Sequence, residues 1–172
     1  MNRPIAYTLL FVATMLLQVF LFDNLSLSVW VDPLVYVAFL ILLPLDLSAV
    51  AILGLGLLTG AAMDFAMGTA GLNTLATLPV AFFRSWLLQL LSRRDDLREG
   101  GIPSPERLGR RVFVHYLIAT VLFHHALFFA FEALSWSHIP LTALRTVASA
   151  AVTFVFVWLI ARIFTAKVVL RP

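Results

Sequence analysis

Apart from Arg84 and Arg145, the arginines and lysines of this chain gather at three places, and long apolar segments separate those places. The first place is the N-terminus with Arg3, the second is the stretch 92–111, and the third is the C-terminal part with Arg162, Lys167 and Arg171. If the apolar segments cross a bilayer, an even number of crossings lies between neighbouring clusters. All three clusters then share one side, which is the positive-inside pattern. We therefore expect a multi-pass membrane protein with both ends in the cytoplasm.

Composition supports this interpretation. The chain has 172 residues, of which 62% are hydrophobic and 12% charged, and its mean hydropathy is +0.99. Soluble domains are about 45–50% apolar and about 25% charged, so a soluble fold of this size would leave too much apolar surface in water. The net charge of +3 sits at membrane-flanking positions, where basic residues set orientation and contact anionic lipid. We expect membrane lipids as partners, and no nucleic acid.

Six apolar segments follow one another along the chain, and a helix needs about 20 apolar residues to span a bilayer. We expect an all-α integral membrane protein with six transmembrane helices in a single polytopic domain covering residues 1–172. The six ranges are 5–22, 27–43, 47–63, 72–91, 112–134 and 141–164.

The second segment is the least regular of the six. Asp32 and Pro33 are typical of a helix start, and Pro44 ends the segment. A helix over 33–43 covers only about 16 Å of a hydrocarbon core about 30 Å thick. Either the helix extends upstream through 27–31, or the second and third segments enter the membrane together as a re-entrant pair. Both arrangements leave the later loops on the same sides.

The loops agree with this sidedness. With the N-terminus inside, the outward loops are 23–32, 64–71 and 135–140, and none of them contains Lys or Arg. The loop 92–111 faces inward, where it either meets cytoplasmic components or forms a solvated basic surface. Its basic residues are Arg93, Arg94, Arg98, Arg107, Arg110 and Arg111.

A stripe of small residues marks the third segment. Gly56, Gly60 and Asp64 lie at i, i+4 and i+8, so they share one face of a helix. Gly-x-x-x-Gly is a signature of close helix packing in membranes. We expect this stripe to bring the backbone, and Asp64 with it, against a neighbouring helix, which belongs either to this chain or to a partner.

Ionisable residues inside apolar segments are functional candidates because a membrane helix accommodates them at a cost. Asp64, Glu132 and Arg145 converge at about one depth near the outer side, and Arg145 is their only cation. We predict that Arg145 pairs with Glu132, with Asp64 or with both, either to fix helix packing or to contact a ligand or partner. We expect Arg84 to extend to the inner interface beside Trp86.

The sequence contains no pattern typical of a metal site or of catalysis. His125 and Glu132 share a helix face but lie about 10 Å apart along its axis, and their spacing is no known zinc pattern. We expect His124 and His125 to be packing residues. There is no cysteine, nucleophile elbow, phosphate loop or paired-carboxylate motif. We therefore expect no metal, no cofactor and no enzymatic activity.

Gly60 and Asp64 form a Gly-x-x-x-Asp motif at the expected end of the third helix, and Gly71, Leu72 and Leu75 form Gly-Leu-x-x-Leu several residues later. This pair of motifs resembles the most recognisable element of the rod-shape-determining protein MreD family. Supporting similarities are Pro33-Leu-Val-Tyr-Val, the Leu43-Pro44 turn, and the stretch 124–132, which is similar to one branch of the family.

The resemblance implies a non-enzymatic subunit of the bacterial elongation machinery in the inner membrane. Its direct partner would be MreC, and MreB, RodA and the class B transpeptidase would belong to the same complex. The candidate packing or partner-binding residues are Gly56, Gly60, Asp64, Gly68 and Gly71.

The MreD family is similar in fold to the S components of energy-coupling-factor vitamin transporters. The alternative function is therefore that of a substrate-binding S component. Such a protein would need a ligand pocket open to the outside, whereas the outward loops of this chain are short.

The predicted sidedness can be tested with single cysteines, because the natural chain contains none. In intact cells, Ser137→Cys should react with a membrane-impermeant thiol reagent and Gly100→Cys should react only after the cells are opened. Labelling of position 100 with protection of position 137 would reverse the topology.

Overall fold

The computed structural model describes residues 3–22, 31–93, 97–133 and 139–169. The described residues are mostly helical and contain no strand, so the predicted all-α class is confirmed for them. The helices are α1 (Arg3–Leu16) with a π-helical continuation η1 (Leu17–Phe22), η2 (Val35–Val37), α2 (Ala38–Ile41), α3 (Ala49–Met67), α4 (Leu72–Leu91), α6 (Pro105–Leu108), α7 (Arg110–Ala133) and α8 (Ile139–Val169).

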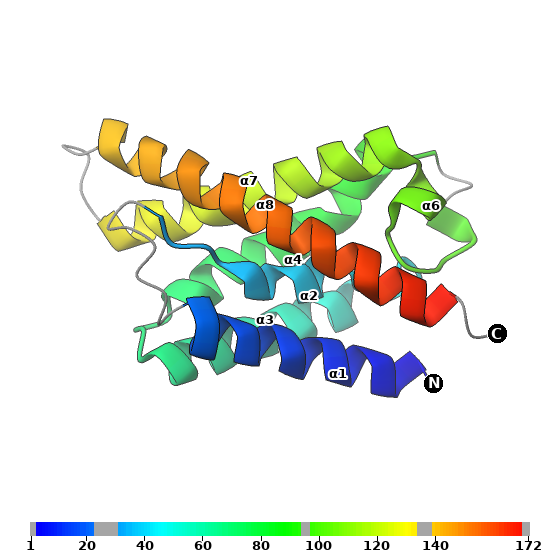
Figure 1. The fold of residues 1–172 in the computed structure, drawn as a ribbon, viewed down its shortest axis with the longest axis horizontal. Helices are drawn as coiled ribbons and strands as arrows, with labels where there is room; N and C mark the ends of the chain where they lie inside the picture. Colours follow the sequence, from blue (N-terminus) through cyan, green and yellow to red (C-terminus); the bar gives the residue numbers. More distant parts are fainter. Residues whose placement is uncertain (1–2, 23–30, 94–96, 134–138, 170–172) are drawn as a thin grey trace.

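Five of these helices are long and apolar enough to cross a membrane, which fits a multi-pass membrane protein. They are α1 with η1, α3, α4, α7 and α8. Helix α3 packs on α4, α4 on α7, and α7 on α8. The first turn of α1, the last turn of α8 and α6 lie at one end of the bundle (Figure 1). We call this the basic end, and we call the opposite end, which holds the α3–α4 turn, the Asp64 end.

The expected helix over 27–43 is wrong for the residues that the structure describes. The chain is non-helical from Asp32 to Leu34, makes one 3-10 turn in η2, and forms only four α-helical residues in α2. It runs through the middle of the bundle, and residues 34–43 are all buried (Figure 1). One reason is Pro33, which disfavours a helical conformation at the preceding residue. The other is that side chains from four neighbouring helices take over the hydrogen bonds that a helix would make.

This buried segment, residues 31–43, leads to the basic end. After it, the backbone N–H of Leu45 donates to the carbonyl of Gly101 over 2.8 Å, which holds the turn against the loop between α4 and α7. The segment therefore connects the two ends of the bundle without forming a spanning helix. From one basic cluster to the next, the chain therefore passes an even number of times from one end of the bundle to the other. The sequence pattern requires this even number.

The glycine stripe packs α3 against α4 inside the protein. A Cβ atom on Gly56 would lie 2.7 Å from Cβ of Ala81, and one on Gly60 would lie 2.5 Å from Cα of Thr74. Thr77 adds a hydrogen bond from its hydroxyl to the carbonyl of Gly56, at 3.3 Å. Of the two options that the sequence left open, an internal neighbour or a partner, the structure shows the internal one.

The other two glycines of the predicted set shape the turn between α3 and α4. Gly68 has φ 66° and ends α3, and Gly71 has φ 91° and precedes α4. A Cβ atom on either would meet nothing within 4 Å. Their contribution is the left-handed backbone conformation, which glycine adopts without steric cost, and not close packing.

The α3–α4 contact predicts different outcomes for two glycine substitutions in the same helix. Gly60→Ala should destabilise the protein by about 1–3 kcal/mol, because the new methyl group must displace the backbone of α4. Gly54→Ala is the control, since Gly54 is exposed and its added Cβ would have no neighbour within 4 Å. Thermal unfolding of the detergent-solubilised variants measures the difference. Equal midpoints for both variants would contradict the close contact.

Candidate functional site

The candidate site is a buried polar network around the segment 31–43. Backbone N–H and C=O groups at membrane depth must be satisfied within the protein, because lipid offers no hydrogen bonds. The N–H of Asp32 donates to the hydroxyl of Ser149 on α8 over 2.9 Å, and the N–H of Leu34 donates to the hydroxyl of Thr153, one turn further, over 3.1 Å. Two hydroxyls of α8 thus replace helix hydrogen bonds at the start of the segment.

Gln18 binds the same stretch of backbone from the other side. Its side-chain amide donates to the carbonyl of Pro33 over 3.0 Å, and its side-chain oxygen accepts from the N–H of Val35 over 2.7 Å. Gln18 is completely buried within the π-helical η1. One amide side chain therefore holds both a donor and an acceptor of the non-helical backbone.

His125 completes this group. Its Nδ1 lies 2.9 Å from the carbonyl of Val121, which can only accept, so Nδ1 carries the proton. Its Nε2 is then an acceptor, and it lies 3.0 Å from the hydroxyl of Thr153 and 3.4 Å from the N–H of Leu34. The neutral ring thereby orients Thr153 toward the segment.

Two side chains satisfy the carbonyls at the other end of the segment. The hydroxyl of Tyr116 on α7 donates to the carbonyl of Ile41 over 3.1 Å, and the guanidinium of Arg84 on α4 donates to the carbonyl of Leu43. Arg84 is only 2% exposed, whereas Trp86 is 60% exposed. The expectation that Arg84 extends to the interface beside Trp86 was wrong, because the open carbonyl of Leu43 offers an acceptor inside the protein.

Asp64 caps the N-terminus of α4. Its carboxylate accepts from the backbone N–H groups of Asn73 and Thr74, both at 2.9 Å, and from the hydroxyls of Thr69 and Thr74, both at 2.6 Å. The first N–H groups of a helix lack partners within that helix, and the helix dipole favours a negative charge there. A carboxylate from the end of α3 therefore fixes the start of α4.

A hydrogen-bonded chain leads from this cap to the middle of the bundle. The side-chain amide of Asn73 donates to Asp64 over 3.2 Å, and its oxygen accepts from the hydroxyl of Tyr36 over 2.7 Å. The Tyr36 oxygen lies 3.1 Å from Nε2 of His124. Because Tyr36 has only one proton and gives it to Asn73, Nε2 of His124 is the donor. Asn73, Tyr36 and His124 are fully buried.

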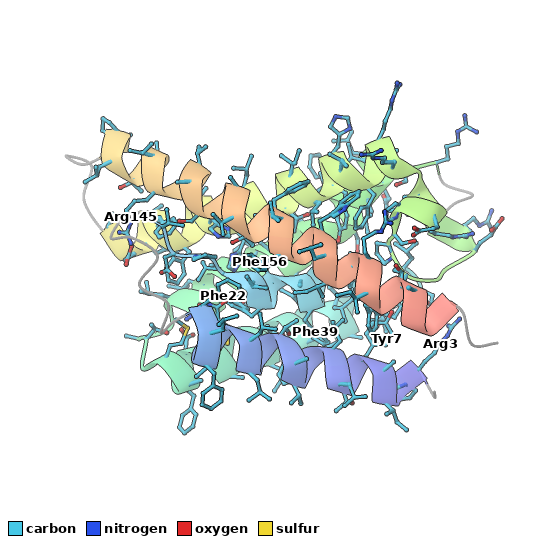
Figure 2. All side chains as sticks on the ribbon, viewed as in Figure 1. Arg3, Tyr7, Phe22, Phe39, Arg145 and Phe156 are labelled. Atoms are coloured by element: carbon cyan, nitrogen blue, oxygen red, sulfur yellow. The ribbon has the colours of Figure 1, made fainter. Side chains whose placement is uncertain are left out.

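The charge cluster predicted near the Asp64 end is brought together only in part. Nη1 of Arg145 lies 2.9 Å from Oε2 of Glu132, and its guanidinium lies 4.7 Å from the ring centroid of Phe129. Figure 2 shows Arg145 at the opposite end of the bundle from Arg3. Asp64 does not join this pair, since it bonds to the start of α4. Both side chains of the pair are partly exposed, so its contribution to the stability of the fold depends on the lipid interface around it.

The basic loop lies at the basic end, as α6 does (Figure 1). Arg107 pairs with Glu99 over 2.7 Å. The side chains of Arg93, Arg98, Arg110 and Arg111 are exposed, and Arg94 lies outside the described residues.

The network is more extensive than the sequence suggested. Gln18, Tyr36, Asn73, Ser149 and Thr153 were not among the predicted site residues, although a glutamine and an asparagine within apolar segments were a readable signal. Within the described ranges no group of three or more His, Asp or Glu side chains is placed to hold a metal. The side chains of this network bond to the backbone of segment 31–43 and to one another.

No family model matches this chain, and neither a curated protein nor a solved structure is detectably similar to it. The resemblance to the MreD family therefore stays a prediction from its motifs.

Two tyrosines provide a test of the network. Tyr36→Phe should destabilise the protein by about 1–3 kcal/mol, because it leaves Asn73 and His124 without their buried partner. Tyr7→Phe is the matched control, since the buried hydroxyl of Tyr7 has no hydrogen-bond partner among the described residues. Thermal unfolding in detergent gives both values. If the Tyr36→Phe variant is as stable as Tyr7→Phe, the hydrogen bonds of Tyr36 do not stabilise the fold.

Proposed function

We propose that this protein is a non-enzymatic subunit of the bacterial elongation complex, which binds MreC in the inner membrane and helps to organise peptidoglycan synthesis and cell shape. Both of its ends and its basic loop face the cytoplasm, where the positive-inside pattern favours them. MreB, RodA and the class B transpeptidase are further members of the assembly.

The observation that carries this proposal is the structural role of the motif residues. Gly60 allows the backbones of α3 and α4 to touch, and Asp64 caps α4 with four hydrogen bonds to backbone and hydroxyl donors of Thr69, Asn73 and Thr74. Residues with such roles shape a rigid helical frame and do no chemistry on a substrate. This supports a protein that acts by holding other membrane proteins in place.

The buried polar groups support the same proposal. Gln18, His125 and Thr153 bond to the backbone of the buried segment, and Asn73 and Tyr36 bond to each other. A transport component needs polar groups that are available to its ligand. Groups that already bond to the protein favour a scaffold over the vitamin-binding alternative.

The proposal predicts which proteins accompany this one. Affinity purification of the tagged protein in mild detergent, followed by mass spectrometry, should recover MreC and wall-synthesis proteins. A tagged unrelated multi-pass membrane protein expressed at the same level is the control. Recovery of a pair of ATPase subunits together with a bound vitamin would instead establish the transporter component.

A further inference from the structure

A groove lies between α7 and α8, where the two helices diverge from their crossing toward the basic end (Figure 1). It encloses about 280 Å³. Its lining consists of Arg110 and Val114 from α7 and of Phe154, Val155, Trp158 and Leu159 from α8. The groove is therefore apolar and aromatic except for one arginine, which is the first residue of α7.

Aromatic contacts hold the wall of the groove in place. The ring of Trp158 stacks on that of Phe154, with the centroids 6.2 Å apart, and it packs against Phe113, with the centroids 5.6 Å apart. Phe113 is fully buried, whereas Phe154 and Trp158 are partly buried. Rings that pack on one another in this way keep a defined geometry. The groove thus has a preformed apolar surface.

Arg110 is available to an anion that enters the groove. Its side chain is exposed. The ion pairs in the described part of the chain are Arg107 with Glu99 and Arg145 with Glu132, so Arg110 has no acidic partner there. The first N–H groups of α7 also lack partners within the helix, and they add a partial positive charge. Both features attract an anion to this end of the groove.

Arg162 adds a second positive charge on the side of α8. It follows Trp158 by four residues and Val155 by seven, so it continues the face of α8 that lines the groove. Like Arg110, it is exposed and belongs to neither ion pair of the described residues. The groove therefore leads from apolar walls toward arginines on both of its helices.

The depth of Arg110 indicates which anion can reach it. Helix α7 has 24 residues, so it is about 36 Å long. The hydrocarbon core of a bilayer is only about 30 Å thick, so the first residue of α7 lies at the level of the lipid headgroups. The bilayer itself supplies phosphates at this level, and basic pockets between membrane helices on the cytoplasmic side bind such headgroups.

We propose that the groove binds one anionic phospholipid, whose phosphate accepts hydrogen bonds from Arg110 and whose acyl chain lies against Val114, Val155 and Trp158. Arg162 strengthens the attraction from the side of α8. A lipid with net negative charge is preferred to a zwitterionic one, because the headgroup of the latter brings its own cation to the two arginines. The proposal does not depend on the identity of any protein partner.

The test uses the fluorescence of Trp158. In the full-length protein, Trp30, Trp86 and Trp136 are replaced by Phe, which leaves Trp158 as the single tryptophan. The protein is reconstituted in phosphatidylcholine vesicles that contain phosphatidylglycerol or phosphatidylcholine with brominated acyl chains, at equal mole fractions. Bromine quenches a tryptophan that it contacts. We expect Trp158 to show a preference for phosphatidylglycerol of about fivefold, the effect of one arginine near an anionic headgroup.

A protein that keeps only Trp86 is the control for the general attraction of anionic lipid. Trp86 is 60% exposed on α4 and does not line this groove. Its quenching should therefore show a preference near one. This comparison needs no substitution of an arginine, so it decides the proposal even if an arginine variant fails to fold.

Two neighbouring arginines provide the matched variants. Arg110 and Arg111 are both exposed in the first turn of α7, so Arg110→Gln and Arg111→Gln remove the same charge at nearly the same depth. Only Arg110 lines the groove. In the protein with Trp158 alone, Arg110→Gln should lower the preference for phosphatidylglycerol to near one, whereas Arg111→Gln should leave it at about fivefold.

The other outcomes overturn the site. Equal quenching of Trp158 by the two brominated lipids, or quenching by neither, means that no anionic lipid occupies the groove. An equal preference at Trp86, or an equal loss in Arg110→Gln and Arg111→Gln, means that anionic lipid gathers around the basic end without a specific site. None of these results bears on the recovery of MreC, so the proposed function stands or falls separately.

Discussion

The structure depends on how the central segment 31–43, whose only helical parts are the short η2 and α2, obtains its hydrogen bonds. In a hydrocarbon environment an irregular backbone persists only where protein groups satisfy it. Here the donors and acceptors come from Gln18, Arg84, His125 and Thr153, which belong to four different long helices. The segment is thus both the least regular part of the chain and the part that the other helices hold most directly.

This requirement explains why polar residues lie inside the apolar helices. Each of them looks costly when its helix is considered alone, because a polar group in lipid lacks partners. Within the bundle Gln18, His125 and Thr153 bond to the segment that needs them. α3 presents no such side chain to the segment; it is joined through Asp64 and Asn73 to Tyr36, which belongs to the segment itself.

Hydropathy and charge predicted much of the fold, because those signals are local. The long helices and the pairing of Arg145 with Glu132 follow from composition, spacing and the sign of charge, whereas Gly68 and Gly71, which were predicted as packing residues, act through their positive φ. The path of residues 31–43 does not, since an apolar run has the same composition whether it forms a helix or an irregular buried segment. Its conformation depends on partners such as Gln18 and Thr153, which are far away in the sequence. The same limit applies to Arg84, whose acceptor, Leu43, is 41 positions away.

The buried segment runs from the Asp64 end of the bundle toward the basic end, so it links groups at the two ends (Figure 1). Tyr36, near its start, belongs to the chain of hydrogen bonds that begins at Asp64, while Leu43, at its end, accepts from Arg84. A stretch of eight residues therefore connects the capped turn at the Asp64 end with the Arg84 guanidinium nearer the basic end. Because residues 34–43 are packed on all sides, a shift of Leu43 cannot be absorbed by loose surroundings. The position of Arg84 is consequently fixed by the fold as a whole and not only by the helix that carries it.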